Sequence, residues 1–171
     1  MILYFSINAL LLITLAFLAF QDIKYRAISW WLIPVILLLL GFRLLEQNVF
    51  IEDIVFNMSI NLLLIMIQLL LVTIYFSLKE RRFVNIIDKY LGLGDILFFL
   101  SCSVAFKYDM YIMFLLFSFL TAIVVAFFYM KLFKKKTILI PLAGIMSINL
   151  ILLISIDFLF SINLFLNQTT L

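Results

Sequence analysis

Long apolar segments alternate with short polar ones along the whole chain. The first apolar segment, residues 2–20, contains no charged residue. Because a hydrocarbon core about 30 Å thick is crossed by roughly 20 apolar helical residues, a segment of this length predicts a membrane-spanning helix. The same pattern predicts further spans, and the expected spanning helices are residues 2–20, 30–45, 54–78, 90–106, 110–130 and 137–156. These segments lack the strict alternation of barrel strands.

The composition agrees with a helical membrane protein. Of the 171 residues, 68% are hydrophobic and 12% are charged, which excludes a soluble globular domain. Nothing of domain size remains outside the apolar segments, so residues 1–171 are expected to form a single transmembrane domain. Residues 2–20 lack the basic start and the small-residue cleavage site of a signal peptide, and we expect them to stay as the first span. The predicted fold class is all-α, a bundle of six transmembrane helices.

The basic residues are distributed unevenly among the loops. Ten of the 12 Lys and Arg residues follow the first, third and fifth expected spans, and only Arg43 and Lys107 lie elsewhere. The positive-inside rule then places these three loops in the cytoplasm and both termini outside. We therefore expect a multi-pass protein of the inner (cytoplasmic) membrane, in contact with lipids and without a nucleic-acid partner. Binding of anionic lipid by the basic loops is an alternative reason for the asymmetry.

The chain has no histidine, which excludes several kinds of active site. Without histidine there can be no Ser-His-Asp or Cys-His catalytic group and no histidine-containing zinc site. Cys102 is the only cysteine, so an intrachain disulfide and a four-cysteine zinc site are excluded as well. It lies within an expected span, where a small buried side chain is the expected role. We expect no metal and no cofactor.

One aspartate lies inside an expected span. Counted from Tyr90 to Phe106, the fourth span is only just long enough to cross, so Asp95 must lie within the membrane near one end of it. An ionised carboxylate there is destabilising by several kcal/mol unless it is paired, protonated or in a wet cavity, and such residues are usually functional. Gly92 and Gly94 allow a neighbouring segment to approach closely. The alternative is a glycine packing notch beside an interfacial aspartate, and this stretch alone does not decide between the two.

A second aspartate is expected at the same membrane depth. The first span runs inward and the fourth outward, so Asp22 and Asp95 both lie at cytoplasmic ends. Two close carboxylates share a proton, so that one can activate water as a general base while the other, protonated, polarises a carbonyl group. This is the chemistry of aspartic proteases. The alternative for Asp22 is a solvated turn residue paired with Lys24 or Arg26.

The other polar residues are expected to be solvated or structural. Three further aspartates, in loops or at a span end, are expected to be solvated: Asp88, Asp109 and Asp157. Three acids on the outer side cannot join the pair: Glu46, Glu52 and Asp53. Three polar residues of the third span are expected to join helices by hydrogen bonds, with a polar cavity as the alternative: Asn57, Asn61 and Gln68.

Three short segments resemble motifs of the type IV prepilin peptidases, intramembrane aspartyl proteases that include the archaeal preflagellin peptidases. Residues 22–29 (Asp-Ile-Lys-Tyr-Arg-Ala-Ile-Ser) resemble the turn with the family's first catalytic aspartate. Residues 92–96 (Gly-Leu-Gly-Asp-Ile) resemble its Gly-x-Gly-Asp motif, and residues 140–144 (Ile-Pro-Leu-Ala-Gly) resemble the start of its last span. The three segments occur in the family's order.

The resemblance implies that Asp22 and Asp95 are the catalytic pair, that Gly92 and Gly94 support the motif, and that no metal takes part. The implied activity is that of an aspartic-type endopeptidase. It would cleave the leader peptide of prepilin-like proteins at the cytoplasmic face of the membrane.

The implied substrates are prepilin-like membrane proteins with a short basic leader, which belong to type IV pilus assembly and protein secretion. Lys24 and Arg26, beside the first aspartate, are candidate contacts for substrate or lipid. The larger bacterial members of the family carry a cytoplasmic insertion with zinc-binding cysteines and also methylate the new N-terminus. In this chain only residues 21–29 lie at the position of that insertion. The chain thus resembles the short, peptidase-only members.

The sequence departs from the family's pattern at two places. Leu97 stands where a lysine is common, and Ser29 and Trp30 replace a Pro-Asn pair. Two readings from other functional classes therefore stay open. One is a catalytically inactive scaffold of the peptidase fold, and the other is a proton or ion carrier that uses Asp95.

Overall fold

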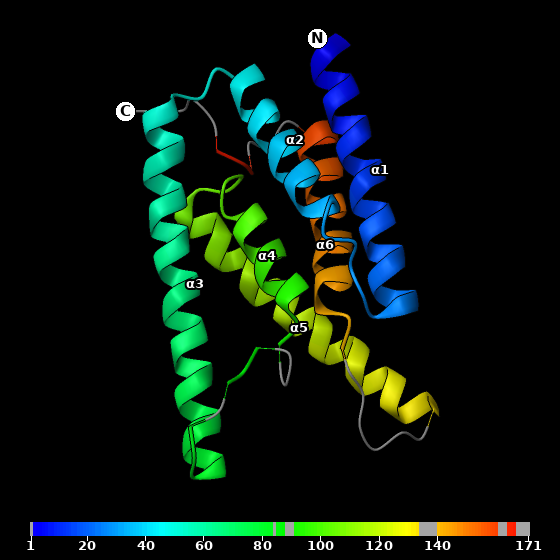
Figure 1. Cartoon of the computed structure of the whole chain (residues 1–171). Helices are drawn as coiled ribbons and strands as arrows, with labels where there is room; N and C mark the ends of the chain where they lie inside the picture. Colours follow the sequence, from blue (N-terminus) through cyan, green and yellow to red (C-terminus); the bar gives the residue numbers. More distant parts are fainter. Residues whose placement is uncertain (1, 84, 88–90, 134–139, 161–163, 167–171) are drawn as a thin grey trace.

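The computed structural model describes residues 2–83, 85–87, 91–133, 140–160 and 164–166. Regular structure in this part of the chain is helical, apart from one isolated bridge between Ile87 and Leu91. The six helices, labelled in Figure 1, are α1 (Ile2–Tyr25), α2 (Leu32–Glu46), α3 (Ile51–Glu80), α4 (Leu93–Cys102), α5 (Tyr108–Phe133) and α6 (Leu142–Phe160). The all-α prediction is confirmed.

Four of the described helices are long and apolar enough to cross a membrane, namely Leu3–Tyr25, Ile51–Glu80, Tyr108–Leu132 and Leu142–Phe160. The other two are shorter, because α2 has 15 residues and α4 has 10. At 1.5 Å per residue α4 is about 15 Å long, half of a hydrocarbon core. A multi-pass membrane protein is thus supported, whereas the count of six spans and the sides of the termini stay predictions.

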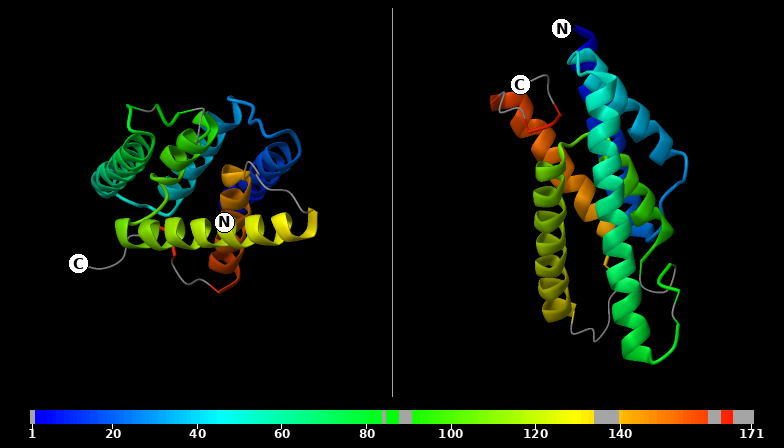
Figure 2. Two further views of the ribbon diagram at one scale, coloured as in Figure 1. Left: turned by 90° about the horizontal axis from the view of Figure 1, so that it is seen from below. Right: turned by 90° about the vertical axis from the view of Figure 1, so that its left-hand side faces the viewer.

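The helices pack around a core that α1, α2 and α6 share with α4 and α5. α1 lies along α6 and α2, and α5 runs obliquely across one face of the bundle (Figures 1 and 2). α3 stands at the side, where it contacts α4 and α5. Fully buried side chains fill the space between these helices, among them Leu15, Ile36, Phe98, Tyr111 and Met146.

α1 is longer than its apolar pattern predicts. It continues through the first half of the expected polar turn and ends at Tyr25, with Asp22 in its last turn. The helix stops because Arg26 adopts a left-handed backbone conformation with φ of 55°, and its N–H still donates to the carbonyl oxygen of Asp22 at 3.0 Å. Lys24 in this last turn interacts favourably with the helix dipole, so polar residues here are compatible with a helix.

Two asparagines join α3 to the turn between α4 and α5. Asn61 Nδ2 donates to the carbonyl oxygens of Ser103 and Phe106, at 2.8 and 2.9 Å. Asn57 Oδ1 accepts a hydrogen bond from the backbone N–H of Tyr108 at 3.3 Å. The predicted hydrogen bonding between helices is confirmed for these two residues.

One prediction about an acidic residue is wrong. Asp157 was expected to be solvated, but its side chain is only 7% exposed and forms an ion pair with the buried Arg43. Asp157 lies in the last turn of α6, where α2 brings Arg43 against it. Asp109 is exposed, as predicted, and Asp88 lies outside the described residues.

Candidate active site

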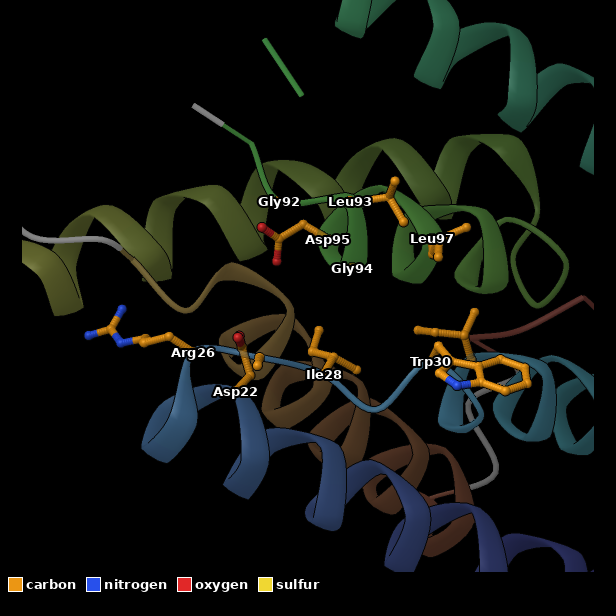
Figure 3. A pocket seen from close by; sticks show the side chains of 11 residues that line it. Asp22, Arg26, Ile28, Trp30, Gly92, Leu93, Gly94, Asp95 and Leu97 are labelled. Atoms are coloured by element: carbon orange, nitrogen blue, oxygen red, sulfur yellow. The ribbon is translucent and has the colours of Figure 1, made fainter. Parts of the chain in front are cut away.

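Asp22 and Asp95 line one cavity between the end of α1, the segment that follows it, and the start of α4. The cavity has a volume of about 370 Å³. Figure 3 shows both carboxyl groups pointing into the same space, although they come from helices far apart in the sequence. The predicted meeting of the two aspartates is therefore present in the structure. Apolar side chains form the walls, namely Ile28, Trp30, Ile33, Leu93 and Leu97.

Asp22 is held inside the bundle. Its exposed fraction is 7%, and its Oδ2 accepts a hydrogen bond from the backbone N–H of Gly144 at 2.7 Å. Within the described part of the chain, neither Lys24 nor Arg26 forms an ion pair with it. The alternative of a solvated, paired turn residue is therefore wrong for Asp22.

Asp95 lies in the first turn of α4, which Gly92 precedes in an extended conformation. Its backbone N–H donates to the carbonyl oxygen of Gly92 at 3.1 Å. Its side chain is half-buried, and Oδ1 accepts a hydrogen bond from the backbone N–H of Ala143 at 2.8 Å. A carboxylate in this first turn also interacts favourably with the dipole of α4.

The two donors are consecutive residues in the first turn of α6. The first hydrogen bond within this helix runs from Ile145 N–H to the Pro141 carbonyl oxygen at 3.1 Å. The N–H groups of Ala143 and Gly144 therefore have no partner inside the helix, as is general for a helix start. They donate instead to the two carboxyl groups, at the positive end of the helix dipole.

Sequence reasoning missed Ala143 and Gly144 as site residues, because their contribution comes from the backbone. The signal that could have indicated them is Pro141 followed by small residues, since proline often marks a helix start and free N–H groups follow there.

The two glycines before Asp95 allow close approach. A Cβ atom on Gly92 would lie 3.2 Å from Oδ2 of Asp95. A Cβ atom on Gly94 would lie 2.9 Å from Cδ1 of Ile28, in the segment that follows α1. Gly92 thus leaves room for the carboxyl group, and Gly94 lets that segment pack against α4.

The two basic candidates lie in different places. Arg26 is exposed and lines the cavity, but its side chain extends away from both aspartates (Figure 3). Lys24 is exposed outside the cavity lining, with its Nζ 5.0 Å from the ring centroids of both Phe20 and Tyr25. Leu97 lines the cavity and forms part of its apolar wall.

The arrangement can activate water. Each carboxyl group uses one oxygen to accept an α6 N–H bond, and the backbone N–H of Gly92 also interacts with the Asp95 carboxyl group. No group of three or more His, Cys, Asp or Glu side chains in that part of the chain could hold a metal ion. The cavity therefore combines two carboxyl groups with apolar walls and with Arg26 at its lining.

Comparison with known proteins places this site in a family. Residues 9–127 match the model of the type IV leader peptidase family, a range that contains both Asp22 and Asp95 but ends before α6. No curated protein and no solved structure matches the chain. Because the matched range is well over half of the sequence, the predicted family is confirmed, and the chain belongs to the type IV leader peptidase family. The third motif, residues 140–144, lies outside the matched range.

Proposed function

We propose that this protein is an intramembrane aspartyl endopeptidase that removes the leader peptide of prepilin-like proteins at the cytoplasmic face of the inner membrane. Membership of a leader peptidase family supports the reaction class. The observation that carries the proposal is the cavity into which the carboxyl groups of Asp22 and Asp95 both point (Figure 3). The reaction needs no metal, cofactor or histidine.

In the proposed reaction the two aspartates act as a unit that holds one proton. The ionised carboxylate takes a proton from water, and the oxygen of that water attacks the scissile carbonyl carbon. The protonated carboxyl group donates its hydrogen bond to the carbonyl oxygen and stabilises the charge that develops there. The tetrahedral intermediate then collapses, the C–N bond breaks, and the leaving nitrogen takes up a proton from the pair.

The walls of the cavity suit a peptide with apolar residues beside the scissile bond. Ile28, Trp30 and Leu97 contribute apolar surface to the lining of the cavity. We also propose that Arg26 and Lys24, both exposed at this end of α1, contact the substrate or lipid headgroups. Membrane lipids and a prepilin-like protein are thus the proposed partners.

The test uses the purified full chain in detergent or liposomes with a prepilin-like substrate that carries its leader. We expect cleavage at the leader junction by the wild type, and loss of cleavage in Asp22→Asn and in Asp95→Asn, because asparagine is similar in shape but cannot exchange the catalytic proton. The double variant should be no worse than either single one, because groups that act as a unit are not additive. Asp109→Asn is the control, because Asp109 is exposed.

The outcomes separate the alternatives. Retained cleavage in either single variant would overturn the assignment of the pair. A folded wild type that cleaves no prepilin-like substrate would favour the inactive scaffold, for which the apolar Leu97 in the cavity is the specific observation.

A further inference from the structure

Gly144 and Asp22 approach each other so closely that a side chain on residue 144 would displace its neighbours by a few tenths of an ångström. A Cβ atom at this position would lie 3.0 Å from Oδ2 and 3.2 Å from Cβ of Asp22, and 3.3 Å from Cγ1 of Ile23. The same carboxyl oxygen accepts the Gly144 N–H bond at 2.7 Å. The absence of a side chain at residue 144 therefore allows the short bond to form.

The start of α6 is a rigid support for these bonds. Ala143, Met146 and Leu150 are fully buried, and α6 packs along α1 for much of its length. α4, which carries Asp95, is by contrast a short helix of 10 residues. The N–H groups of adjacent residues point the same way in a helix start, so they hold the two acceptors at a defined separation.

We propose that the first turn of α6 positions the two aspartates relative to each other. Gly144 is the positioning residue, because the missing side chain lets Asp22 come close enough to accept its N–H bond. The inference rests on the proposed function, because it assigns these bonds a role in that reaction. It adds residues outside the range that matches the family model.

A Gly144→Ala substitution tests the proposal directly. The added methyl group must displace the Asp22 carboxyl group or α6, because two of its three nearest atoms belong to Asp22 and one of them is the Cβ atom, which cannot rotate away. Displacement of catalytic groups by about 1 Å can slow a reaction by roughly 100-fold. Gly41→Ala is the matched control, because Gly41 also lies within a helix and a Cβ atom there would meet nothing within 4 Å.

The kinetic experiment compares both variants with the wild type on the prepilin-like substrate. Because the contacts require a shift of only a few tenths of an ångström, we expect kcat of Gly144→Ala to fall by roughly 10-fold. KM should stay within about threefold, because the apolar walls that would bind the peptide are unchanged. Gly41→Ala should retain both constants. A purely structural defect would instead reduce the folded fraction and leave kcat per folded molecule unchanged.

A second measurement does not depend on cleavage. The chain has only four glycines, so labelling with ¹⁵N-glycine gives four backbone amide resonances in detergent micelles. The variants Gly144→Ala and Gly41→Ala each remove one resonance and so assign those two. In Asp22→Asn the bond from Gly144 no longer goes to a carboxylate, and its proton resonance should move upfield. Asp95→Asn should move it less, because Asp95 accepts from Ala143, and the Gly41 resonance should not move in either variant.

These outcomes distinguish the inference from the proposed function. A Gly144 resonance that does not respond to Asp22→Asn overturns the inference, and this holds even if Gly144→Ala fails to fold. The inference is also overturned if a folded Gly144→Ala retains the wild-type kcat. If the Gly144 resonance responds to Asp22→Asn but the wild-type protein has no peptidase activity, the hydrogen bonds are as described here and the proposed function is wrong.

Discussion

Arg43 Nη2 and Asp157 Oδ2 lie 2.6 Å apart, and both side chains are buried. Asp157 is about 20 Å along α6 from the turn that holds the active-site carboxyl groups, so this pair belongs to the opposite end of the bundle. Arg43 Nε also donates to Asn8 Oδ1 at 3.0 Å, and the guanidinium carbon lies 4.0 Å from the ring centroid of Phe165. The ion pair thus joins α1, α2 and α6 at a distance from the cavity.

Removal of one partner of this pair should destabilise the protein strongly. In Asp157→Asn the buried Arg43 charge loses its counter-ion, and we expect the free energy of unfolding to fall by about 3–5 kcal/mol. Replacing both partners, in Arg43→Met with Asp157→Leu, should recover most of this loss. Unfolding in detergent measures the effect, with the exposed Asp109→Asn as control. Equal stability of Asp157→Asn and the control would show that the pair contributes nothing.

Asn61 should be a second residue with a large effect on stability. Asn61→Ala removes two hydrogen bonds and leaves the carbonyl oxygens of Ser103 and Phe106 without a donor in a buried place. We expect a loss of about 1–3 kcal/mol in the free energy of unfolding. Ser59→Ala, on the exposed face of the same helix, should be nearly neutral, because the Ser59 hydroxyl bonds only to Val55 of its own helix. A loss no larger than in Ser59→Ala would contradict this role.

Gly94 should be needed for full activity, because a side chain at this position would meet Ile28. In Gly94→Ala the new methyl group meets Cδ1 of Ile28 at 2.9 Å, and because this atom is the end of a flexible side chain, Ile28 must adopt another rotamer. We expect cleavage to slow by roughly threefold to 10-fold, because Ile28 lines the cavity and its new rotamer changes the wall beside the two aspartates.

The double variant Gly94→Ala with Ile28→Val should recover activity. Valine lacks Cδ1, and the remaining Cβ and Cγ1 atoms would stand at 3.5 and 3.6 Å, which is ordinary contact. Ile28→Val alone is the control, and initial rates of leader cleavage are the measurement. If the double variant is as slow as Gly94→Ala, the contact with Ile28 is not the cause.

Cleavage should not depend on a metal ion. The chain has no histidine and one cysteine, so we expect a chelator to leave the rate unchanged. The measurement is the cleavage rate after dialysis against a chelator, with and without added zinc. A loss of activity that zinc restores would mean that the peptidase-only assignment is wrong.

The side of the membrane on which each end of α3 lies can be determined with single cysteines in a Cys102→Ser background. Asn48 and Arg81 are exposed residues at the two ends of α3. The asymmetry of basic residues predicts that Asn48→Cys reacts with an impermeant thiol reagent from outside and Arg81→Cys only after the membrane is opened. The reverse result would place the cavity on the outer face and remove the proposed cleavage in the cytoplasm.

The sequence predicted the helices and the meeting of Asp22 with Asp95, because apolar length and charge asymmetry determine where a span's ends lie. It could not show that α1 continues to Tyr25, since polar residues at a helix end look like a loop in hydropathy. Asp157 was assigned to solvent because its partner Arg43 is 114 positions away and no local pattern links them. Gly144 was missed as part of the site because a backbone donor has no side-chain signature.

The shortness of α4 has a consequence for how its ends are solvated. A soluble protein can leave the last carbonyl oxygens of a helix to water, but hydrocarbon offers no hydrogen bonds. Here protein groups take the place of water at the end of α4, because Tyr111 Oη donates to the carbonyl oxygen of Phe99 at 2.9 Å and Ser103 Oγ to that of Leu100 at 2.6 Å. In the turn that follows, Asn61 donates to the carbonyl oxygens of Ser103 and Phe106. The chain can therefore end a helix deep inside an apolar protein without leaving these carbonyl groups unsatisfied, and in this way it keeps Asp95 on a segment too short to span the bilayer.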